Sequence, residues 1–373
     1  MSGRSVKITG SKLLTLPRIL EAACTRKGLD IIGVIDCHSP EVIREMEQMI
    51  ERDELQQLVE GGLRFQETVL IPGTEIEIYD QYCQGPIHVL AYFPTLALIK
   101  EFSNWMSGHM KNIHLSTQRL YCDARTLQHK VRDLGGLFIP AHVFTPFKSL
   151  YGKGVLKSLT EVLDPHLIDA IELGLSSDTN MVHAIRELHP YTFVTNSDAH
   201  SVGKMAREYQ KLLLAQPSFE ELKKALQVKD GRNVVANYGL NPLLGKYYQT
   251  VCAHCGERVD DYIAECPLCG SKHMTKGVST RIQELSERIE VKRERPPYIH
   301  QVPLDFIPGL GPKMMERLIQ VFGTEMAILH KTTEEQLAQV VPQKIAKAID
   351  LSKTGQLAIT IGGGGVYGKV QFD

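Results

Sequence analysis

The first 236 residues alternate short runs of β-branched and other apolar residues with longer amphipathic stretches, and this alternation constrains the fold more than any other feature. Strand-like runs lie at residues 30–35, 68–71, 87–92, 137–139 and 191–195. Stretches with apolar residues at helical spacing lie between them, for example at residues 41–58 and 218–228. Such a chain is expected to fold as an α/β layer or barrel, in which functional side chains gather at the C-terminal ends of the strands.

Side chains that can bind metal ions stand within these runs or just after they end. They are Asp36, His38, Glu75, His88, His142, Glu172, Asp198 and His200. Histidines with carboxylates suit zinc, manganese or iron, and clustered ions suit phosphoester hydrolysis, because one activates water while together they neutralise phosphate oxygens. Taken singly, each residue has an ordinary alternative, since Asp198 could cap a helix and Glu172 could pair with a lysine. The ordered set is the stronger argument for a metal site.

Four of the eight cysteines form two Cys-x2-Cys pairs that are ten residues apart. They are Cys252, Cys255, Cys266 and Cys269. This spacing predicts a closed site in which four thiolates bind one structural zinc ion, and the alternative is four free thiols. The predicted module, residues 237–278, is too short to bury a sufficient core, so the metal would supply the missing stability. Zinc ribbons of this kind contact nucleic acid in some proteins and are purely structural in others.

A glycine-containing turn lies in residues 303–355, which are predicted to be helices joined by hairpins. Gly309, Gly311 and Lys313 stand where the turn opens a helix, and the segment resembles the helix-hairpin-helix motif of DNA repair proteins. Backbone N–H groups and the helix N-terminus would bind a DNA phosphate there, with Lys313 nearby. The alternative is a plain turn between helices. A second copy of the helix-hairpin-helix motif at residues 337–346 lacks the glycines, and it is expected only to pack against the first copy.

Two further segments flank this helical region. Residues 279–302 are rich in charge and are predicted to be a charged helical linker, stopped by the prolines at 296 and 297. Residues 356–373 are predicted to be a C-terminal tail with a strand, a run of four glycines at 362–365 and a second strand. The glycine run is expected either to approach a nucleotide closely or to turn between the strands.

Overall composition limits the classes of partner. The formal net charge is −1, so a nucleic-acid surface would have to be local. No run of eighteen apolar residues occurs, which predicts that the chain does not cross a membrane. Residues 1–7 lack the apolar core of a signal peptide. We therefore expect a cytoplasmic location, where cysteines remain thiols or metal ligands.

Five short motifs carry a resemblance to a known family. Their order is Asp-x-His at 36–38, Pro-Gly-x-Glu at 72–75, Ile-His-Val-Leu at 87–90, Pro-Ala-His at 140–142 and Ser-Asp-Ala-His at 197–200. This order resembles the PHP (polymerase and histidinol phosphatase) superfamily. The resemblance implies an α/β fold of the PHP type, a distorted seven-stranded (β/α)7 barrel, with a catalytic divalent metal cluster of Zn, Mn or Mg. By the same resemblance, the metal ligands are Asp36, His38, Glu75, His88, His142, Asp198 and His200, and Asp198, His142 and His200 also act as catalytic residues.

The sequence departs from that family pattern in two places. The family begins with a strand that carries His-x-His, but no histidine precedes His38 and residues 2–4 read as a loop, so the first barrel strand is predicted to be missing. Cys37 also separates Asp36 from His38, where the family has the two adjacent. The chain is either a fragment whose start lies upstream or a degenerate member with a weakened cluster. The fragment is the preferred hypothesis, because the remaining positions are intact.

The order of an α/β barrel, a four-cysteine ribbon and hairpin helices is similar to the endonuclease Q group over the whole chain except the absent start. The resemblance implies a metal-dependent DNA repair endonuclease that cuts 5′ to uracil, hypoxanthine, xanthine or an abasic site, leaving a 3′-hydroxyl and a 5′-phosphate. Damaged DNA is the implied partner, and the sequence names no protein partner. Two alternatives stay open: a DNA-binding protein of the same fold without hydrolysis, and a small-molecule phosphoesterase, against which the C-terminal modules argue.

Overall fold

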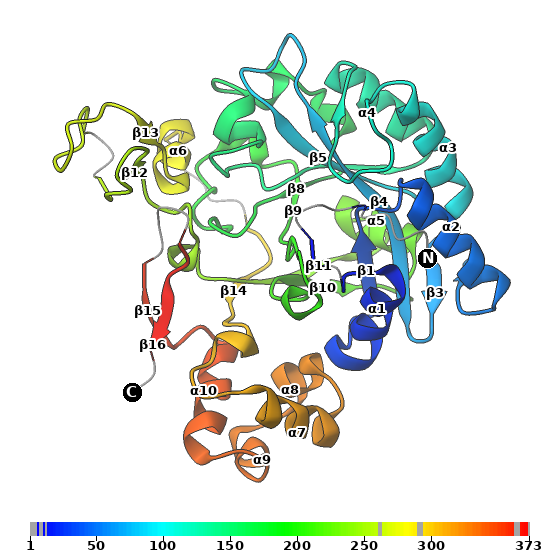
Figure 1. Ribbon diagram of the computed structural model, residues 1–373, viewed down its shortest axis with the longest axis vertical. Helices are drawn as coiled ribbons and strands as arrows, with labels where there is room; N and C mark the ends of the chain where they lie inside the picture. The colour runs from blue at the N-terminus through cyan, green and yellow to red at the C-terminus, as the bar shows by residue number, and fades with distance from the viewer. Residues whose placement is uncertain are drawn as a thin grey trace.

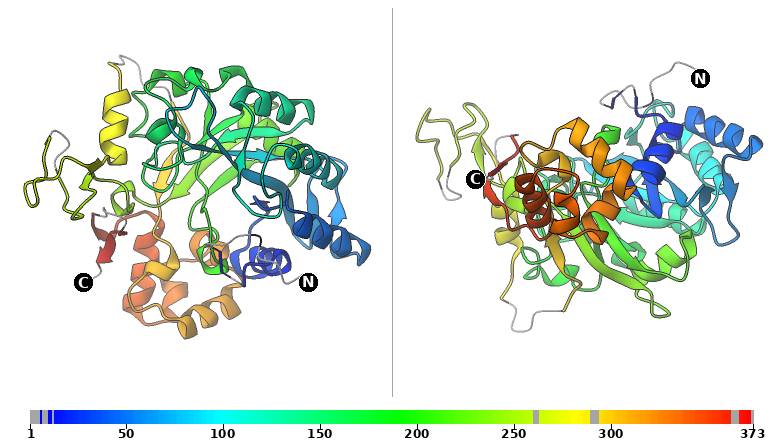
Figure 2. Two further views of the ribbon diagram at one scale, coloured as in Figure 1. Left: turned by 45° about the horizontal axis from the view of Figure 1, so that its top comes forward. Right: turned by 90° about the horizontal axis from the view of Figure 1, so that it is seen from below.

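The computed structural model describes residues 6, 10–11, 13–259, 263–288, 294–361 and 366–371. An α/β body forms the largest part of the molecule, and a helical module lies below it in Figure 1. A small cysteine module lies to one side, with the C-terminal strands between it and the helical module. Figure 2 shows the helical module against the side of the body that carries helix α1.

A curved sheet is the centre of the α/β body (Figure 1). Its seven strands are β1 (Ile31–Val34), β2 (Gln56–Gln57), β3 (Leu63–Phe65), β4 (Thr68–Ile78), β5 (Ile87–Tyr92), β6 (Arg119–Leu120) and β7 (Leu137–Pro140). The long strand β4 pairs with β3 and β5 in antiparallel and with β1 and β6 in parallel orientation. Nearly every residue of β4 is buried, which explains the apolar run of Val69, Leu70 and Ile71 near its start.

Two smaller sheets complete the body. They contain β8 (Ala170–Glu172) with β9 (Thr192–Val194), and β10 (Tyr209–Leu213), β11 (Asn233–Gly239) and β14 (Tyr298–His300). All five strand-like runs in the sequence are strands in the structure, and the predicted α/β fold is confirmed. The predicted loop at residues 2–4, which bears on the missing first strand, lies outside the described residues.

Helices cover the sheets. They are α1 (Leu16–Glu21), which continues as a π-helix over Ala22–Lys27, α2 (Pro40–Glu51), α3 (Leu96–Ser107), α4 (Ala124–Asp133) and α5 (Phe219–Gln227). Ser39, Thr95, Asp123 and Ser218 each cap a helix by accepting a backbone N–H of its first turn. The helix predicted over residues 41–58 is wrong beyond Glu51, because Asp53 takes a left-handed φ of 57° and the chain then enters β2.

The cysteine module contains β12 (Val251–Cys252) and β13 (Met274–Thr275) and is followed by α6 (Val278–Leu285). The charged segment predicted as a helical linker is helical only in α6, and part of it, residues 289–293, lies outside the described residues. Arg281 of α6 donates to the carbonyl oxygens of Tyr151, Val155 and Leu156, and β14 pairs with β11. These contacts join the segment to the α/β body, so it does not act as a free linker.

The helical module has an apolar core of its own. Its elements are a 3-10 turn at Leu304–Phe306, α7 (Pro312–Phe322), α8 (Glu325–Lys331), α9 (Glu334–Ala338) and α10 (Gln343–Lys353). Leu318, Ile328 and Ile349 are fully buried in it. The module docks on the body through Lys27, a buried lysine whose Nζ lies 2.8 Å from Glu325 Oε2 and donates to the carbonyl oxygen of Gly203.

The C-terminal tail forms the antiparallel pair β15 (Ala358–Thr360) and β16 (Lys369–Gln371). The backbone N–H of Gly368 donates to Leu244, which ties the tail to the segment before the cysteine module. The glycine run at 362–365, with its predicted approach to a nucleotide, lies outside the described residues. Within the described part of the chain, no helix has both the length and the apolar character that a bilayer span requires.

Glu208 is a buried carboxyl group beside the ends of β9 and β11. Its Oε1 accepts the backbone N–H of Leu240 at 2.9 Å, and its Oε2 accepts the hydroxyl of Thr195. Burial raises the pKa of Glu208 from 4.5 to about 8. The body therefore contains an acid that is protonated at neutral pH.

We expect Glu208→Gln to remove a loss of stability that the unaltered protein suffers as the pH rises from about 5 to about 8. Since the pKa is 4.5 when unfolded and about 8 when folded, the folded state binds more protons in this window and loses stability as the pH rises through it. Glutamine stays neutral, so the Tm of Glu208→Gln relative to that of the unaltered protein should rise by several degrees between about pH 5 and pH 8. The conversion is that about 1 kcal/mol of stability shifts Tm by roughly 2–4 °C. Trp105 fluorescence reports unfolding, and parallel Tm profiles of the two proteins would contradict the prediction.

Candidate metal centre

One carboxylate and two imidazoles meet on three neighbouring strands. Glu75 lies in β4, His88 in β5 and His142 just after β7. Glu75 Oε1 is 3.4 Å from His88 Nδ1 and 3.6 Å from His142 Nε2, and the two imidazole nitrogens are 3.3 Å apart. Glu75 and His88 are buried, and His142 is nearly so. Carboxylate oxygen and imidazole nitrogen at these separations are a donor set that fits a divalent cation.

Three threonine hydroxyl groups hold candidate ligands in place. Thr117 donates to Glu75 Oε2 at 2.6 Å. Thr145 Oγ1 lies 3.0 Å from His142 Nδ1. Thr74 Oγ1 lies 2.8 Å from His38 Nδ1. Each hydrogen bond fixes the rotation of the ring or carboxylate and determines which atom faces away from the hydroxyl.

Attraction between Glu75 and the two imidazoles favours the ionised carboxylate and the protonated rings. Burial opposes the ionisation of Glu75, but hydrogen bonds from His142 and His88 outweigh it and hold the pKa of Glu75 well below 4.5. Burial likewise disfavours the His142 cation, but Glu75 raises the pKa of His142 to about 9. The pKa of His88 is also raised, against burial, by Glu75 and Glu77. A negative carboxylate is thus maintained at neutral pH where a cation would bind.

Two buried atoms near the cluster have no hydrogen-bond partner among the described residues, and both are potential ligands. They are Asp36 Oδ1 and His88 Nε2. Asp36 lines the same cavity as Glu75 and His142, which has a volume of about 1010 Å³. An unsatisfied buried polar atom is costly, so Asp36 Oδ1 is a candidate to bind a cation, whereas His88 Nε2 lies 3.9 Å from Glu77 Oε2.

The remaining predicted ligands are arranged differently. Asp198 lines the cavity after β9, with a left-handed φ of 41°, and its Oδ1 is 3.5 Å from His200 Nε2. Both of these side chains are more than two-fifths exposed. His38 is buried beside Thr74, and its Nε2 is 3.4 Å from the carbonyl oxygen of Leu115. Glu75, His88 and His142 are therefore in contact, Asp36 and Asp198 share their cavity, and His38 and His200 are held outside the contact group.

Glu172 has neighbours that the sequence did not identify. Its Oε2 accepts the backbone N–H of His142 at 2.8 Å, and its Oε1 accepts Asn196 Nδ2 at 2.7 Å. No lysine pairs with Glu172 among the residues that the structure describes. The sequence analysis also did not identify the three threonines that hold candidate ligands. Thr74 and Thr145 stand one and three residues from predicted ligands, but Thr117 comes from a distant loop that gives no sequence signal.

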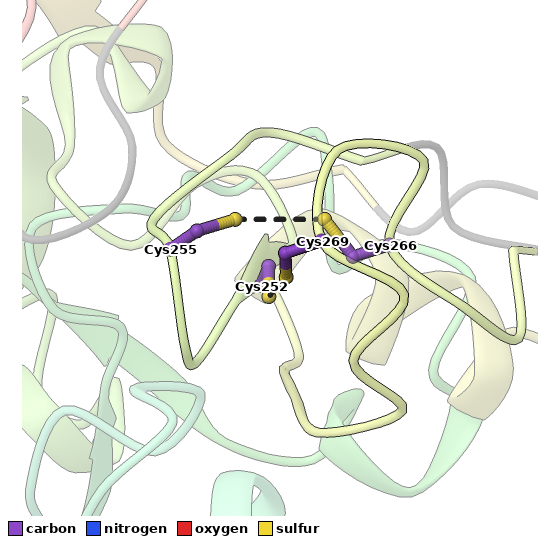
Figure 3. Close-up of side chains that lie close together, drawn as sticks. All are labelled: Cys252, Cys255, Cys266 and Cys269. Atoms are coloured by element: carbon purple, nitrogen blue, oxygen red, sulfur yellow. Dashed lines mark hydrogen bonds between the residues drawn. The ribbon is translucent and has the colours of Figure 1, made fainter.

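The four predicted zinc ligands face one another across two loops (Figure 3). The Sγ atoms of Cys252 and Cys269 are 3.6 Å apart, and those of Cys255 and Cys266 are 3.5 Å apart. A tetrahedron with metal–sulfur bonds of about 2.3 Å has edges of roughly 3.8 Å. The cysteines form no disulfide, and backbone N–H groups of Cys255 and His254 lower the pKa of Cys252 to about 6. The neighbouring thiols raise the pKa of Cys255 to about 12, so the distances between the sulfur atoms, and not the pKa values, fit a closed four-thiolate metal site.

The predicted phosphate-binding turn is exposed. Gly309 has a φ of 83°, which favours glycine, and Gly311 is the N-cap of α7. Lys313 stands exposed in the first turn of that helix. The second hairpin, between α9 and α10, turns at residues 339–342 without glycine. Phosphate binding by Gly309, Gly311 and Lys313 stays a prediction.

The chain was compared with known proteins by sequence. No model of a protein family matches it. The uncharacterized protein YqxK of Bacillus subtilis (strain 168) is 56% identical over 370 residues, which are 99% of this chain and 96% of that protein. The uncharacterized protein MJ0043 of Methanocaldococcus jannaschii is 37% identical over 254 residues, which are 61% of this chain and 31% of that protein.

Two solved structures have the same fold along nearly the whole chain. The crystal structure of the lesion-specific endonuclease PfuEndoQ from Pyrococcus furiosus has a TM-score of 0.86 and 31% identity, and the similarity covers 98% of this chain and 92% of that one. Endonuclease Q in complex with a 27-mer duplex substrate with an abasic lesion at its active site also has a TM-score of 0.86 and 31% identity, over 99% and 94% of the two chains. This chain belongs to the endonuclease Q family.

Proposed function

We propose that the protein is a DNA repair endonuclease that hydrolyses the phosphodiester on the 5′ side of a deaminated base or an abasic site. The products are a 3′-hydroxyl and a 5′-phosphate. The observation that carries the proposal is the contact group of Glu75, His88 and His142 on a large cavity, in a chain of the endonuclease Q family. The related structures, described as lesion-specific and as bound to a duplex with an abasic lesion, support DNA as the substrate.

The residues of the centre have different roles in the proposed hydrolysis. A cluster of divalent Zn, Mn or Mg ions, when bound by Glu75, His88 and His142 with Asp36 and Asp198, supplies an activated water and neutralises phosphate charge. Thr117 and Thr145 keep the Glu75 carboxylate and the His142 ring in fixed orientations. His200, exposed beside Asp198, is placed to hold a proton for the leaving 3′-oxygen.

Recognition of the lesion requires the damaged nucleotide to leave the base stack, because its altered edge is hidden in a duplex. Deamination converts an amino donor into a carbonyl acceptor. A pocket of backbone N–H groups would accept uracil, hypoxanthine or xanthine, and would leave the donors of cytosine or adenine unpaired at about 1–3 kcal/mol each.

A second candidate function is DNA binding without hydrolysis. It is favoured by one observation: in the described part of the chain, Glu75, His88 and His142 are the only three of the predicted catalytic ligands whose ligand atoms all lie within 4.8 Å of one another. His38 is satisfied by protein groups instead. The test is incubation of the protein with Mg²⁺ or Mn²⁺ and a duplex that contains one uracil. Absence of a nick with either metal would remove the endonuclease proposal and leave the binding function.

We expect His142→Ala to lower the rate of nicking by more than about a hundredfold. His142 is proposed as a direct ligand, and even residues that only orient ligands cost about 10–100-fold when they are changed. Binding of the duplex should persist, because the hairpin and the cysteine module are untouched. Denaturing gel electrophoresis gives the rate, and fluorescence anisotropy gives the affinity.

The matched control for that variant is His129→Ala, which changes an exposed histidine on the outer helix α4. This control should nick at the unaltered rate. If His142→Ala nicks as fast as His129→Ala, then His142 has no part in the centre.

We expect the purified protein to hold about one zinc ion per chain in the cysteine module. Cys252→Ser should release this ion and destabilise the module, because a segment of this length buries little apolar surface. Atomic emission spectroscopy measures the zinc. Cys122→Ser, which changes a partly exposed cysteine of the α/β body, should retain it. Equal zinc content in Cys252→Ser and Cys122→Ser would contradict the assignment.

A further inference from the structure

A line of aromatic rings and cations runs between the metal centre and the helical module. At one end the ring of Phe147, half exposed, meets the ring of Tyr247 edge-on with centroids 5.6 Å apart. Lys246 Nζ lies 5.7 Å from the ring centroid of Tyr247 and 5.1 Å from that of Tyr367. Tyr367 comes from the C-terminal tail, so a distant segment of the chain completes the line.

The line continues toward the hairpin turn. The Arg207 guanidinium lies 5.9 Å from the Tyr367 ring centroid, and its Nη1 is 3.2 Å from the Tyr367 hydroxyl oxygen. The rings of Tyr367 and Phe306 are 6.4 Å apart. We name these residues the basic–aromatic strip, whose members are Phe147, Tyr247, Lys246, Tyr367, Arg207 and Phe306.

Both ends of the strip are tied to sites already described. Thr145, which holds His142, also donates to the carbonyl oxygen of Phe147 at 3.1 Å. Arg207 Nε donates at 2.8 Å to the carbonyl oxygen of Ser197, the residue before Asp198. Phe306 ends the 3-10 turn that leads into the exposed glycine turn before α7. The strip therefore spans the distance from the metal centre to the predicted phosphate-binding turn.

No carboxylate in the described part of the chain pairs with the two cations of the strip. Neither Lys246 nor Arg207 forms an ion pair within the described residues, whereas Lys148 near the centre pairs with Glu77. Since the whole chain has a formal net charge of −1, two such cations between aromatic rings are a local anion-attracting feature. Rings interleaved with cations are the chemistry that binds unstacked nucleotides, whose bases stack on rings while their phosphates meet cations.

We propose that the basic–aromatic strip binds the DNA strand next to the lesion in an unstacked form. Bases stack on Phe147, Tyr247 and Tyr367, and phosphates lie against Lys246 and Arg207. The proposal rests on the proposed function and adds where the strand runs between cleavage site and hairpin. An intact duplex hides its base faces, so the strip discriminates in favour of DNA that a lesion has already weakened.

Three labelled probes test the strip: a duplex with one abasic analogue, the same duplex undamaged, and oligothymidylate, all with Ca²⁺ as the added divalent ion. Phe147→Ala and Tyr367→Ala should each weaken binding of the lesion duplex and of oligothymidylate about tenfold, with little change for the undamaged duplex. Tyr367→Phe keeps the ring and should bind like the unaltered protein.

The charge of the strip is tested separately. Lys246→Gln should lower the slope of log K against log salt concentration by about one, because one phosphate contact is lost. Lys100→Gln is the control, since Lys100 pairs with Glu47 on the outer helices and should leave the slope unchanged. Thermal unfolding shows whether each aromatic variant folds. If one does not, the salt dependence of Lys246→Gln decides whether the strip binds DNA.

The outcomes separate the strip from the proposed function. Suppose that the unaltered protein binds and nicks the lesion duplex, and that Phe147→Ala, Tyr367→Ala and Lys246→Gln bind the lesion duplex and oligothymidylate with affinities within twofold of the unaltered protein. The proposed role of the strip is then wrong, and the proposed endonuclease function stands. If the aromatic variants lose equal affinity for the damaged and the undamaged duplex, the proposal is also wrong, because the rings would then not contact unstacked bases. If the unaltered protein neither binds nor nicks the lesion duplex, both proposals fall.

Discussion

The pairing register of β4, β5 and β7 is the constraint on which the candidate centre depends. Glu77 pairs with His88 across β4 and β5, which brings Glu75, two residues along the same face, beside the His88 ring. Leu90 pairs with Ile139, and His142 follows where β7 ends. Side chains alternate between faces along a strand, so a slip of one residue would send Glu75 to the opposite face and separate the three groups. The buried apolar residues of β4 fix this register, and the polar cluster follows from the apolar pattern.

A buried carboxylate beside two imidazoles is costly unless its charge is satisfied. Here Glu75 is satisfied by His88, His142 and the hydroxyl of Thr117, and the backbone of His142 is held in turn by Glu172. Removal of any one member leaves the others with unpaired charge or donors. The cluster therefore persists only as a set, and a divalent cation that takes the place of protons on the imidazoles preserves the balance of charge.

The order of metal-binding residues along the sequence predicted that Glu75, His88 and His142 meet, because strand ends that carry His, Asp or Glu converge in an α/β fold. Cysteine spacing predicted the four-thiolate cluster for the same reason, since two short loops suffice to build it. What the sequence could not predict depends on loops and the tail. Thr117 reaches Glu75 from a distant loop, and Tyr367 reaches Arg207 from the tail. No periodicity places such residues, because their positions follow from packing that is settled only in the folded chain.

The helical module and the strip impose different requirements on a bound DNA strand. A helix N-terminus with a glycine turn binds phosphate whatever the base and whether or not the duplex is intact. Aromatic rings bind only bases that have left the stack, and the cost of unstacking, a few kcal/mol per step, is lowest at a damaged site. Lys27 Nζ contacts Glu325 of the module at 2.8 Å, and this ion pair joins the module to the body that carries the metal centre. The two proposals thus assign affinity for any DNA and preference for damaged DNA to separate surfaces, and they imply that lesion selectivity can change without loss of general binding.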